Sequence, residues 1–156
     1  MIILHGVTGH AHENYMEDMA YRASSDGYNV VVFNHFAPHG ENDMKMIDFG
    51  DNSYFDKVIE FAKKQYQGAY PPEIYLVGFS LGGNFALRFI GDACKSKSEG
   101  KQSSTEADSI KAIAAISNPF DVLHTGVKLK HTRWGLYNKF LYFTLSRPFF
   151  KEAFFD

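Results

Sequence analysis

The feature that most constrains this chain is a regular alternation of short apolar runs with longer segments of helical periodicity. The runs have the β-branched, aromatic and aliphatic composition of strands. They are MIIL (1–4), YNVVVFN (28–34), EIYLVGF (73–79) and SIKAIAAIS (109–117). Because they are apolar on both faces and helical patterns separate them, they predict βαβ units and a parallel sheet covered on both sides. We therefore expect an α/β fold with four parallel strands.

The segments between these runs have apolar residues that return every three or four positions, as in amphipathic helices. Helices are predicted over 13–26, 51–67, 81–94 and 133–146. The polar stretch 95–108, rich in Ser and Lys, is expected to be a flexible surface insertion. There is no internal repeat and no change of composition that would mark a boundary, so the prediction is a single domain over 1–156.

Composition excludes several classes of protein. The 156 residues carry a formal net charge of −2, which offers no basic surface for nucleic acid. No apolar run approaches the roughly 18 residues that span a bilayer, and the first residues lack the pattern of a secretory signal. Cys94 is the only cysteine, so an internal disulfide is excluded. We expect an intracellular protein, cytoplasmic or associated with a membrane surface.

A glycine-rich stretch, GFSLGG at 78–83, joins the third predicted strand to the helix that follows it. Three motifs place glycines at such a junction. A phosphate-binding loop needs a lysine where this chain has Asn84, and a dinucleotide fingerprint needs a different glycine spacing. The third motif, the Gly-x-Ser-x-Gly nucleophile elbow, matches residues 78–82 at every position and in the strand-turn-helix context that it requires.

The elbow predicts a nucleophilic serine. Its sharp turn lifts Ser80 above the sheet, while Gly78 and Gly82 let the strand and the helix pass closely. The alternative is a glycine-rich turn with an incidental serine. An oxyanion hole also needs two N–H donors beside the serine. We expect these donors from Leu81, at the start of the helix, and from Val7, in the HGVTG loop after the first strand.

These stretches resemble the α/β-hydrolase superfamily. HGVTG, GYNVVVFNH, VGFSLGGNFALRFIG, AAISNPFDV and GLYNKFLYFTL look most like its abhydrolase subfamily, which includes YheT-like esterases and membrane-associated phospholipases and lipases. The resemblance runs over nearly the whole chain. It implies that Ser80 is the nucleophile of a Ser-Asp-His triad that acts on carboxylic esters, including lipid acyl esters. It also implies that the four strands correspond to the third to sixth of an eight-stranded sheet.

The family places the triad acid and histidine after later strands, in the order Ser, Asp or Glu, His. By resemblance, both groups are expected outside these 156 residues, and the chain is expected to be part of a longer protein, nearly inert by itself. A substitute triad inside the chain would use Asp121 with His124 or His131. The family also often has an Asn-x-Arg-Gly stretch where this chain has FNHFAPHGEND, at 33–43.

Two further groups of residues have competing interpretations. A set of histidines invites a zinc site, although none forms a helical His-Glu-x-x-His pattern. The set comprises His5, His10, His12, His35 and His39. We interpret them as loop histidines near the mouth of the site and expect no metal and no cofactor. The aromatic segment 133–156 fits a lid or acyl channel that touches lipid, or else a core helix whose packing partners lie elsewhere.

The sequence therefore predicts the core of a serine hydrolase for carboxylic esters. Its expected partner is a small-molecule or lipid ester, not a nucleic acid, and contact with a membrane surface is compatible with this function. The rival hypothesis is a hydrolase-like module that has lost catalysis and serves as a scaffold or as a subunit of a larger assembly. The intact elbow favours the enzyme, because a scaffold gains nothing from a strained serine turn.

Overall fold

The strands in the described part of the chain form one parallel sheet in the order β2-β1-β3-β4. They are β1 (Ile2–Leu4), β2 (Val31–Phe33), β3 (Ile74–Phe79) and β4 (Ile110–Ile116). The computed structural model describes residues 1–7, 9–35, 54–66, 68, 70–101, 106–140 and 142–143. The short strand β1 is central, because Ile3 pairs with Val32 on one side and with Val77 on the other.

The chain divides into two compact units, Met1–Asn118 and Pro119–Asp156. The first contains the sheet, α1 (Asn14–Ser25), α2 (Phe55–Gln65), α3 (Leu81–Ser98) and a 3₁₀ turn at Glu106–Ser109. The second contains α4 (Val122–His131), a 3₁₀ turn at Thr132–Gly135 and helical residues at 136–140. Within the residues described, no helix combines the length and the apolar character needed to cross a membrane.

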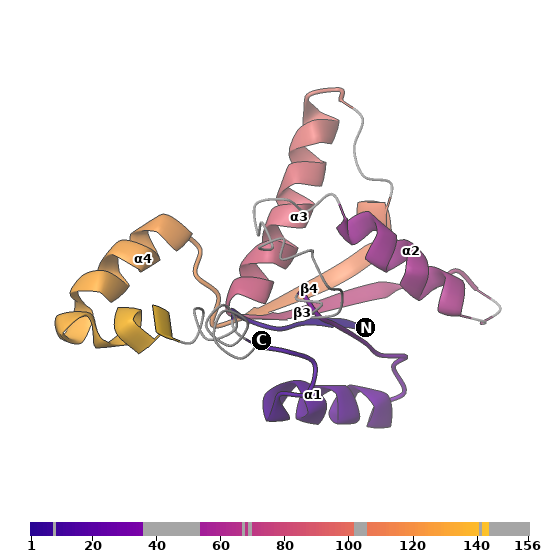
Figure 1. Ribbon diagram of the computed structural model, residues 1–156. Coiled ribbons are helices and arrows are strands. Elements are labelled where there is room, and N and C mark those ends of the chain that lie inside the picture. Colours follow the sequence, from indigo (N-terminus) through magenta and orange to yellow (C-terminus); the bar gives the residue numbers. More distant parts are fainter. Residues whose placement is uncertain are drawn as a thin grey trace, which may run out of the picture. The chain divides into compact units, whose positions relative to one another are not determined.

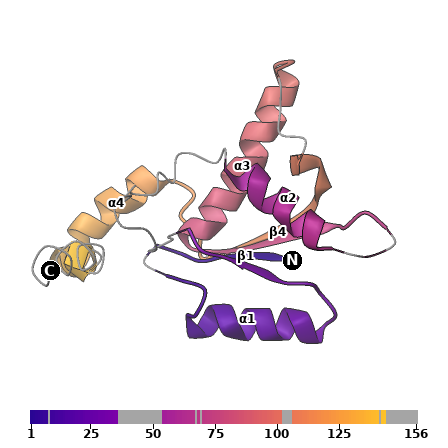
Figure 2. The ribbon, with the colours of Figure 1, turned by 45° about the vertical axis from the view of Figure 1, so that its right-hand side comes forward.

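The helices of the first unit lie on both faces of the sheet. Figure 1 and Figure 2 show α1 on one face and α2 with α3 on the other. The connection from β1 to β2 runs along the sheet in one direction, and the later connections to β3 and β4 run in the opposite direction. Since βαβ crossovers are right-handed, this reversal moves the connecting helix to the opposite face. The doubly wound arrangement confirms the predicted α/β class with parallel strands.

The larger core lies under α2 and α3 and is rich in aromatic side chains. Phe55 packs edge to face against Phe85 and Phe89, with ring centroids 5.2 and 5.1 Å apart. This geometry is the one that the quadrupoles of aromatic rings favour. On the other face, Met16 of α1 and Ile3 of β1 belong to a smaller cluster. The sheet is therefore covered on both sides, as its apolar strands require.

His35 follows β2 and is buried among these rings. The centroid of its imidazole lies 5.1 Å from that of Phe33 and 5.0 Å from that of Phe85, and its Nδ1 lies 3.2 Å from the Tyr54 hydroxyl. Burial, with a smaller effect from the nearby His5, lowers the pKa of His35 from its ordinary value of 6.5 to about 3. The ring is therefore neutral at pH 7.

The helix α4 in the second unit was absent from the predicted elements, because its sequence follows a proline turn and contains Gly126. The Asp121 carboxylate caps this helix by accepting the backbone N–H of His124 at 2.7 Å. Several large apolar side chains of the unit are exposed. They include Phe120, Leu123, Val127, Leu136 and Phe140.

The other elements agree with the prediction to within a few residues, apart from the end of α3 and the predicted helix 133–146. That helix begins as a 3₁₀ turn, and residues 141 and 144–146 lie outside the described residues. The helix α3 continues to Ser98, so the first four residues of the predicted 95–108 insertion are helical. Residues 102–105 lie outside the described residues, and Glu106–Ser109 form a 3₁₀ turn before β4. An ion pair between Lys97 and Asp108 connects the end of α3 to that turn.

Replacing His35 with Phe should make the stability of the protein less sensitive to acid. The pKa of His35 is lower in the folded chain than in the unfolded one, so the unfolded chain binds more protons between about pH 6.5 and 3. Each histidine that takes up a proton on unfolding lowers stability by up to about 1.4 kcal/mol per pH unit as the pH falls through this window. Urea unfolding at several values between about pH 6.5 and 4.5 measures the slope.

The exposed His12 provides a matched control for this experiment. His12→Gln removes a histidine from the surface instead of from the core, so it shows whether the change of slope depends on the buried position of His35. A His35→Phe protein whose slope equals that of the wild type would contradict the buried neutral state of His35.

Candidate active site

Ser80 stands between the last residue of β3 and the first residue of α3, at the carboxyl edge of the sheet. Its backbone has φ 51° and ψ −120°, a conformation that residues with side chains rarely adopt. A nucleophile elbow needs such a strained turn to raise the serine above the ends of the strands. At Ser80 the chain makes the turn that the motif predicts.

Two glycines allow this turn, because backbone groups approach too closely for a side chain. A Cβ atom on Gly78 would lie 2.5 Å from the carbonyl oxygen of Gly82 and from the nitrogen of Gly83. A Cβ atom on Gly82 would strike the carbonyl oxygens of Leu4 and His5, at the end of β1. The first turn of α3 is therefore pressed against both β3 and β1, where only glycine fits.

Hydrogen bonds hold the Ser80 backbone on both sides. Its N–H donates to the carbonyl of Ile116 in β4 at 2.8 Å, and its own carbonyl accepts from the N–H groups of Gly83 at 3.0 Å and Asn84 at 3.2 Å. These bonds offset a backbone strain on the order of 1–3 kcal/mol. The first N–H groups of α3, beginning with that of Leu81, have no acceptor within the helix and carry the positive end of its dipole.

The loop after β1 meets the elbow. A Cβ atom on Gly6 would lie 3.0 Å from the Ser80 Cβ and 3.6 Å from its Oγ, so the Gly6 backbone touches the serine. β1 and β3 are the neighbouring strands whose connections leave in opposite directions, and open α/β sheets bind ligands at the carboxyl ends of such strands. The structure thus brings Gly6, the residue before Val7, against Ser80, the residue before Leu81.

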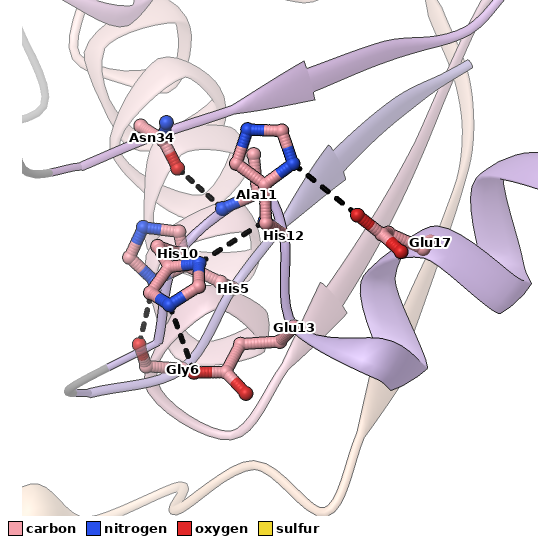
Figure 3. A network of polar contacts seen from close by, with 8 residues as sticks. All are labelled: His5, Gly6, His10, Ala11, His12, Glu13, Glu17 and Asn34. Carbon is pink, nitrogen blue, oxygen red and sulfur yellow. Dashed lines mark hydrogen bonds and ion pairs between the residues drawn. The ribbon is translucent and has the colours of Figure 1, made fainter.

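Polar contacts organise the segment between this loop and α1 (Figure 3). The backbone N–H of His12 donates to His10 Nδ1 at 3.1 Å, and His10 Nε2 lies 3.5 Å from the Glu13 carboxylate. The backbone N–H of Ala11 donates to the Asn34 side-chain oxygen at 2.6 Å. Since Asn34 directly follows β2, this bond joins the loop after β1 to the end of the neighbouring strand.

His5 and His35 lie just after β1 and β2, outside the strands as predicted, but they are 0% and 4% exposed and therefore do not line an open mouth. His5 continues the apolar run of β1 into the core, and its Nε2 accepts the backbone N–H of His35 at 3.0 Å. The three apolar residues directly before His5 are the sequence signal that could have indicated its burial. His10 and His12 are exposed, as predicted.

The same histidines were considered as ligands of a zinc site. Across the described ranges, no three His, Cys, Asp or Glu side chains are grouped so that they could hold a metal ion. His39 lies outside the described residues, as do positions 36–43 of the FNHFAPHGEND stretch and positions 144–156 of the aromatic segment. The interpretations placed on those residues stay predictions.

The residues considered for a triad within the chain have other contacts. Asp121 and His124 take part in the cap of α4, and His131 is the last residue of that helix in the second unit. Capping accounts for an acid at position 121 without catalysis, and the substitute triad stays a prediction.

A second sharp turn lies beside the elbow. Ser117 directly follows β4 and, like Ser80, has φ 51°. Asn118 comes next, and a Cβ atom on Gly83 would lie 2.9 Å from its Cβ. The turn is therefore packed against the first turn of α3. The Asn118-Pro119 pair that follows is a common turn signal, and it predicts that the chain turns after the fourth strand.

The sequence of this chain is similar to one family model and to several proteins that have names. A family model described as the alpha/beta hydrolase fold matches residues 1–147. Monoacylglycerol lipase ABHD2 of Danio rerio and of Homo sapiens is 30% identical over 95 residues, which is 59% of this chain and 21% and 22% of those proteins. An abhydrolase domain-containing protein of Dictyostelium discoideum is 31% identical over 161 residues, 97% of this chain and 36% of its own length. No solved structure matches the chain significantly.

Gly82→Ala should destabilise the protein by about 1–3 kcal/mol, because the added methyl group would strike the carbonyl oxygens at the end of β1. Gly91→Ala is the matched control in the same helix, since nothing lies within 4 Å of its Cβ position. This second substitution should stabilise α3 by up to about 1 kcal/mol through helix propensity. Urea unfolding measures both changes, and equal stability of the two variants would contradict the close contact.

Proposed function

The chain belongs to the α/β-hydrolase fold family, and on that premise we propose that it forms the nucleophile-bearing part of a serine hydrolase for carboxylic esters. The observation that carries the proposal is the strained backbone of Ser80, held between β3 and α3 with the Gly6 backbone against it. A serine in this position, beside the first N–H groups of a helix, is equipped for acyl transfer.

In the proposed reaction, Ser80 Oγ attacks the ester carbonyl carbon while a general base takes its proton. The N–H groups of Val7 and Leu81 stabilise the resulting oxyanion. The tetrahedral intermediate collapses, the proton passes to the departing alkoxide, and an acyl-enzyme remains on Ser80. Water then attacks the acyl-enzyme with the help of the same base, which releases the carboxylic acid and restores the serine.

The general base and its acid partner belong, in this proposal, to the full-length protein outside these 156 residues. Support comes from the order of triad residues in this fold, where both follow the serine after further strands. The chain also spans only about a fifth of the first curated relatives that it matches. Asp121 with His124 or His131 is the alternative source, and alanine variants of these residues with unchanged turnover would remove it.

We further propose that the substrates are acyl esters of lipids. Two observations support this class. The similar proteins from Danio rerio and Homo sapiens are named monoacylglycerol lipases, and the second unit exposes large apolar side chains, among them Phe120 and Leu123. Exposed apolar side chains of this kind suit contact with an acyl chain or with a lipid surface.

Ser80→Ala in the full-length protein should abolish labelling by a fluorophosphonate probe and lower ester turnover by several orders of magnitude. Ser117→Ala is the matched control, because Ser117 follows the adjacent strand and has the same φ. That variant should still be labelled. Gel detection of the probe and release of fatty acid from monoacylglycerol give the two readouts.

The outcomes separate the proposals. A wild-type protein that is not labelled would support the inactive scaffold and contradict the hydrolase. A Ser80→Ala protein that is still labelled would contradict Ser80 as the nucleophile. Labelling that depends on Ser80, combined with hydrolysis of water-soluble esters but not of monoacylglycerol, would retain the hydrolase and contradict the lipid substrate class.

A further inference from the structure

We propose that His5 is a positioning residue that sets the direction of the Val7 N–H by fixing the peptide between Gly6 and Val7. The inference rests on the proposed function, in which that N–H stabilises the oxyanion. The buried His5 side chain has no other role in the proposed reaction at Ser80.

The Gly6–Val7 peptide carries the Gly6 carbonyl and the Val7 N–H in one plane. The peptide is trans, so the two groups point in opposite directions. The Gly6 carbonyl oxygen lies 2.7 Å from His5 Nδ1 and also accepts the N–H of Gly9 at 3.2 Å. Holding the carbonyl in this way holds the N–H on the opposite side of the peptide.

The direction of the His5 hydrogen bond follows from its other nitrogen. The backbone N–H of His35 donates to His5 Nε2 at 3.0 Å, so Nε2 is an acceptor and bears no proton. The proton of the neutral ring must then be on Nδ1, where it is donated to the Gly6 carbonyl. The His35 N–H, just after β2, therefore selects the His5 tautomer with its proton on Nδ1, which is the tautomer that can donate to the Gly6 carbonyl.

The surroundings of His5 keep this ring neutral. The side chain is 0% exposed, and its ring packs edge to face against that of His35 with centroids 5.0 Å apart. Burial lowers the pKa of His5 most, the Gly6 hydrogen bond raises it, and His10 lowers it while Glu13 raises it. A second ring proton would also place two donors against each other, at Nε2 and the His35 N–H.

The hydrogen bond does more than orient the peptide. A donor on a peptide carbonyl polarises the whole amide, which makes the N–H at its other end a stronger donor. An apolar residue at position 5 would continue the packing of β1 but would leave the Gly6 carbonyl without this donor. The choice of histidine after three apolar strand residues is thus explained by the peptide that follows it.

Two substitutions separate the two nitrogens. Asn has a side-chain amide at the distance of Nδ1, so His5→Asn can still donate to the Gly6 carbonyl. Gln reaches the position of Nε2, so His5→Gln can accept from His35 but loses the donor at Gly6. His12→Gln changes an exposed histidine near the same loop and serves as the control.

In the full-length protein, His5→Gln should lower kcat by about tenfold to a hundredfold with little change in KM. It should weaken inhibition by a trifluoromethyl ketone, which forms a tetrahedral oxyanion on the serine, by a similar factor. His5→Asn should stay within a few-fold of the wild type, and His12→Gln should match it. If the role of His5 were purely structural, both His5 variants would lose stability, and their kcat values would not differ in this way.

The tautomer can be read without any variant. Long-range ¹H–¹⁵N spectra of histidine-labelled wild-type protein should show the proton of His5 on Nδ1, and a proton on Nε2 would overturn the inference. Folded His5→Gln protein with wild-type kcat would also overturn it. If labelling still depends on Ser80, that failure leaves the hydrolase intact, whereas labelling independent of Ser80 would remove the proposed function itself.

Discussion

The close packing of the first turn of α3 against the carboxyl end of β1 is the contact on which the rest of the site depends. At Gly82 the backbone of the helix approaches the carbonyl groups of Leu4 and His5 so closely that no side chain fits. This approach brings the start of α3 and the loop after β1 to the same point. Ser80 occupies that point with a backbone that hydrogen bonds to Ile116, Gly83 and Asn84 hold in a rare conformation.

The buried histidines belong to the same contact. His5 extends the apolar strand β1 by one residue, and its two nitrogens join the backbone at the end of β2 to the loop that touches Ser80. His35 packs among the aromatic rings between the sheet and α2 with α3, where burial keeps it neutral. The His5 ring is thus hydrogen bonded to backbone partners on both sides, and these bonds join the core to the edge of the sheet that holds Ser80.

The sequence was sufficient to predict the features that depend on local pattern. The apolar runs gave the strands, and the spacing of glycines around Ser80 gave the sharp turn, because a Gly-x-Ser-x-Gly elbow has few physical alternatives between a strand and a helix. The order of the strands places that turn at the reversal point of the sheet, which the prediction of parallel strands did not specify.

Features that depend on tertiary contacts were predicted less well. The burial of His5 and His35 follows from the pairing of residues 30 positions apart, which periodicity does not reveal. The helix α4 depends on a cap from Asp121 after a proline turn. The last residues of α3, up to Ser98, have a polar composition that suggests a loop. They are helical, and Lys97 among them forms an ion pair with Asp108.

The measurement that tests the central claim most directly is the location of the acyl group during turnover. Full-length protein quenched with an ester substrate and digested for mass spectrometry should carry the acyl mass on the peptide that contains Ser80. Hydrolysis of the ester with the acyl group on another residue, or with no acyl-enzyme under conditions where a covalent intermediate must accumulate, would contradict the assignment of Ser80 as the nucleophile.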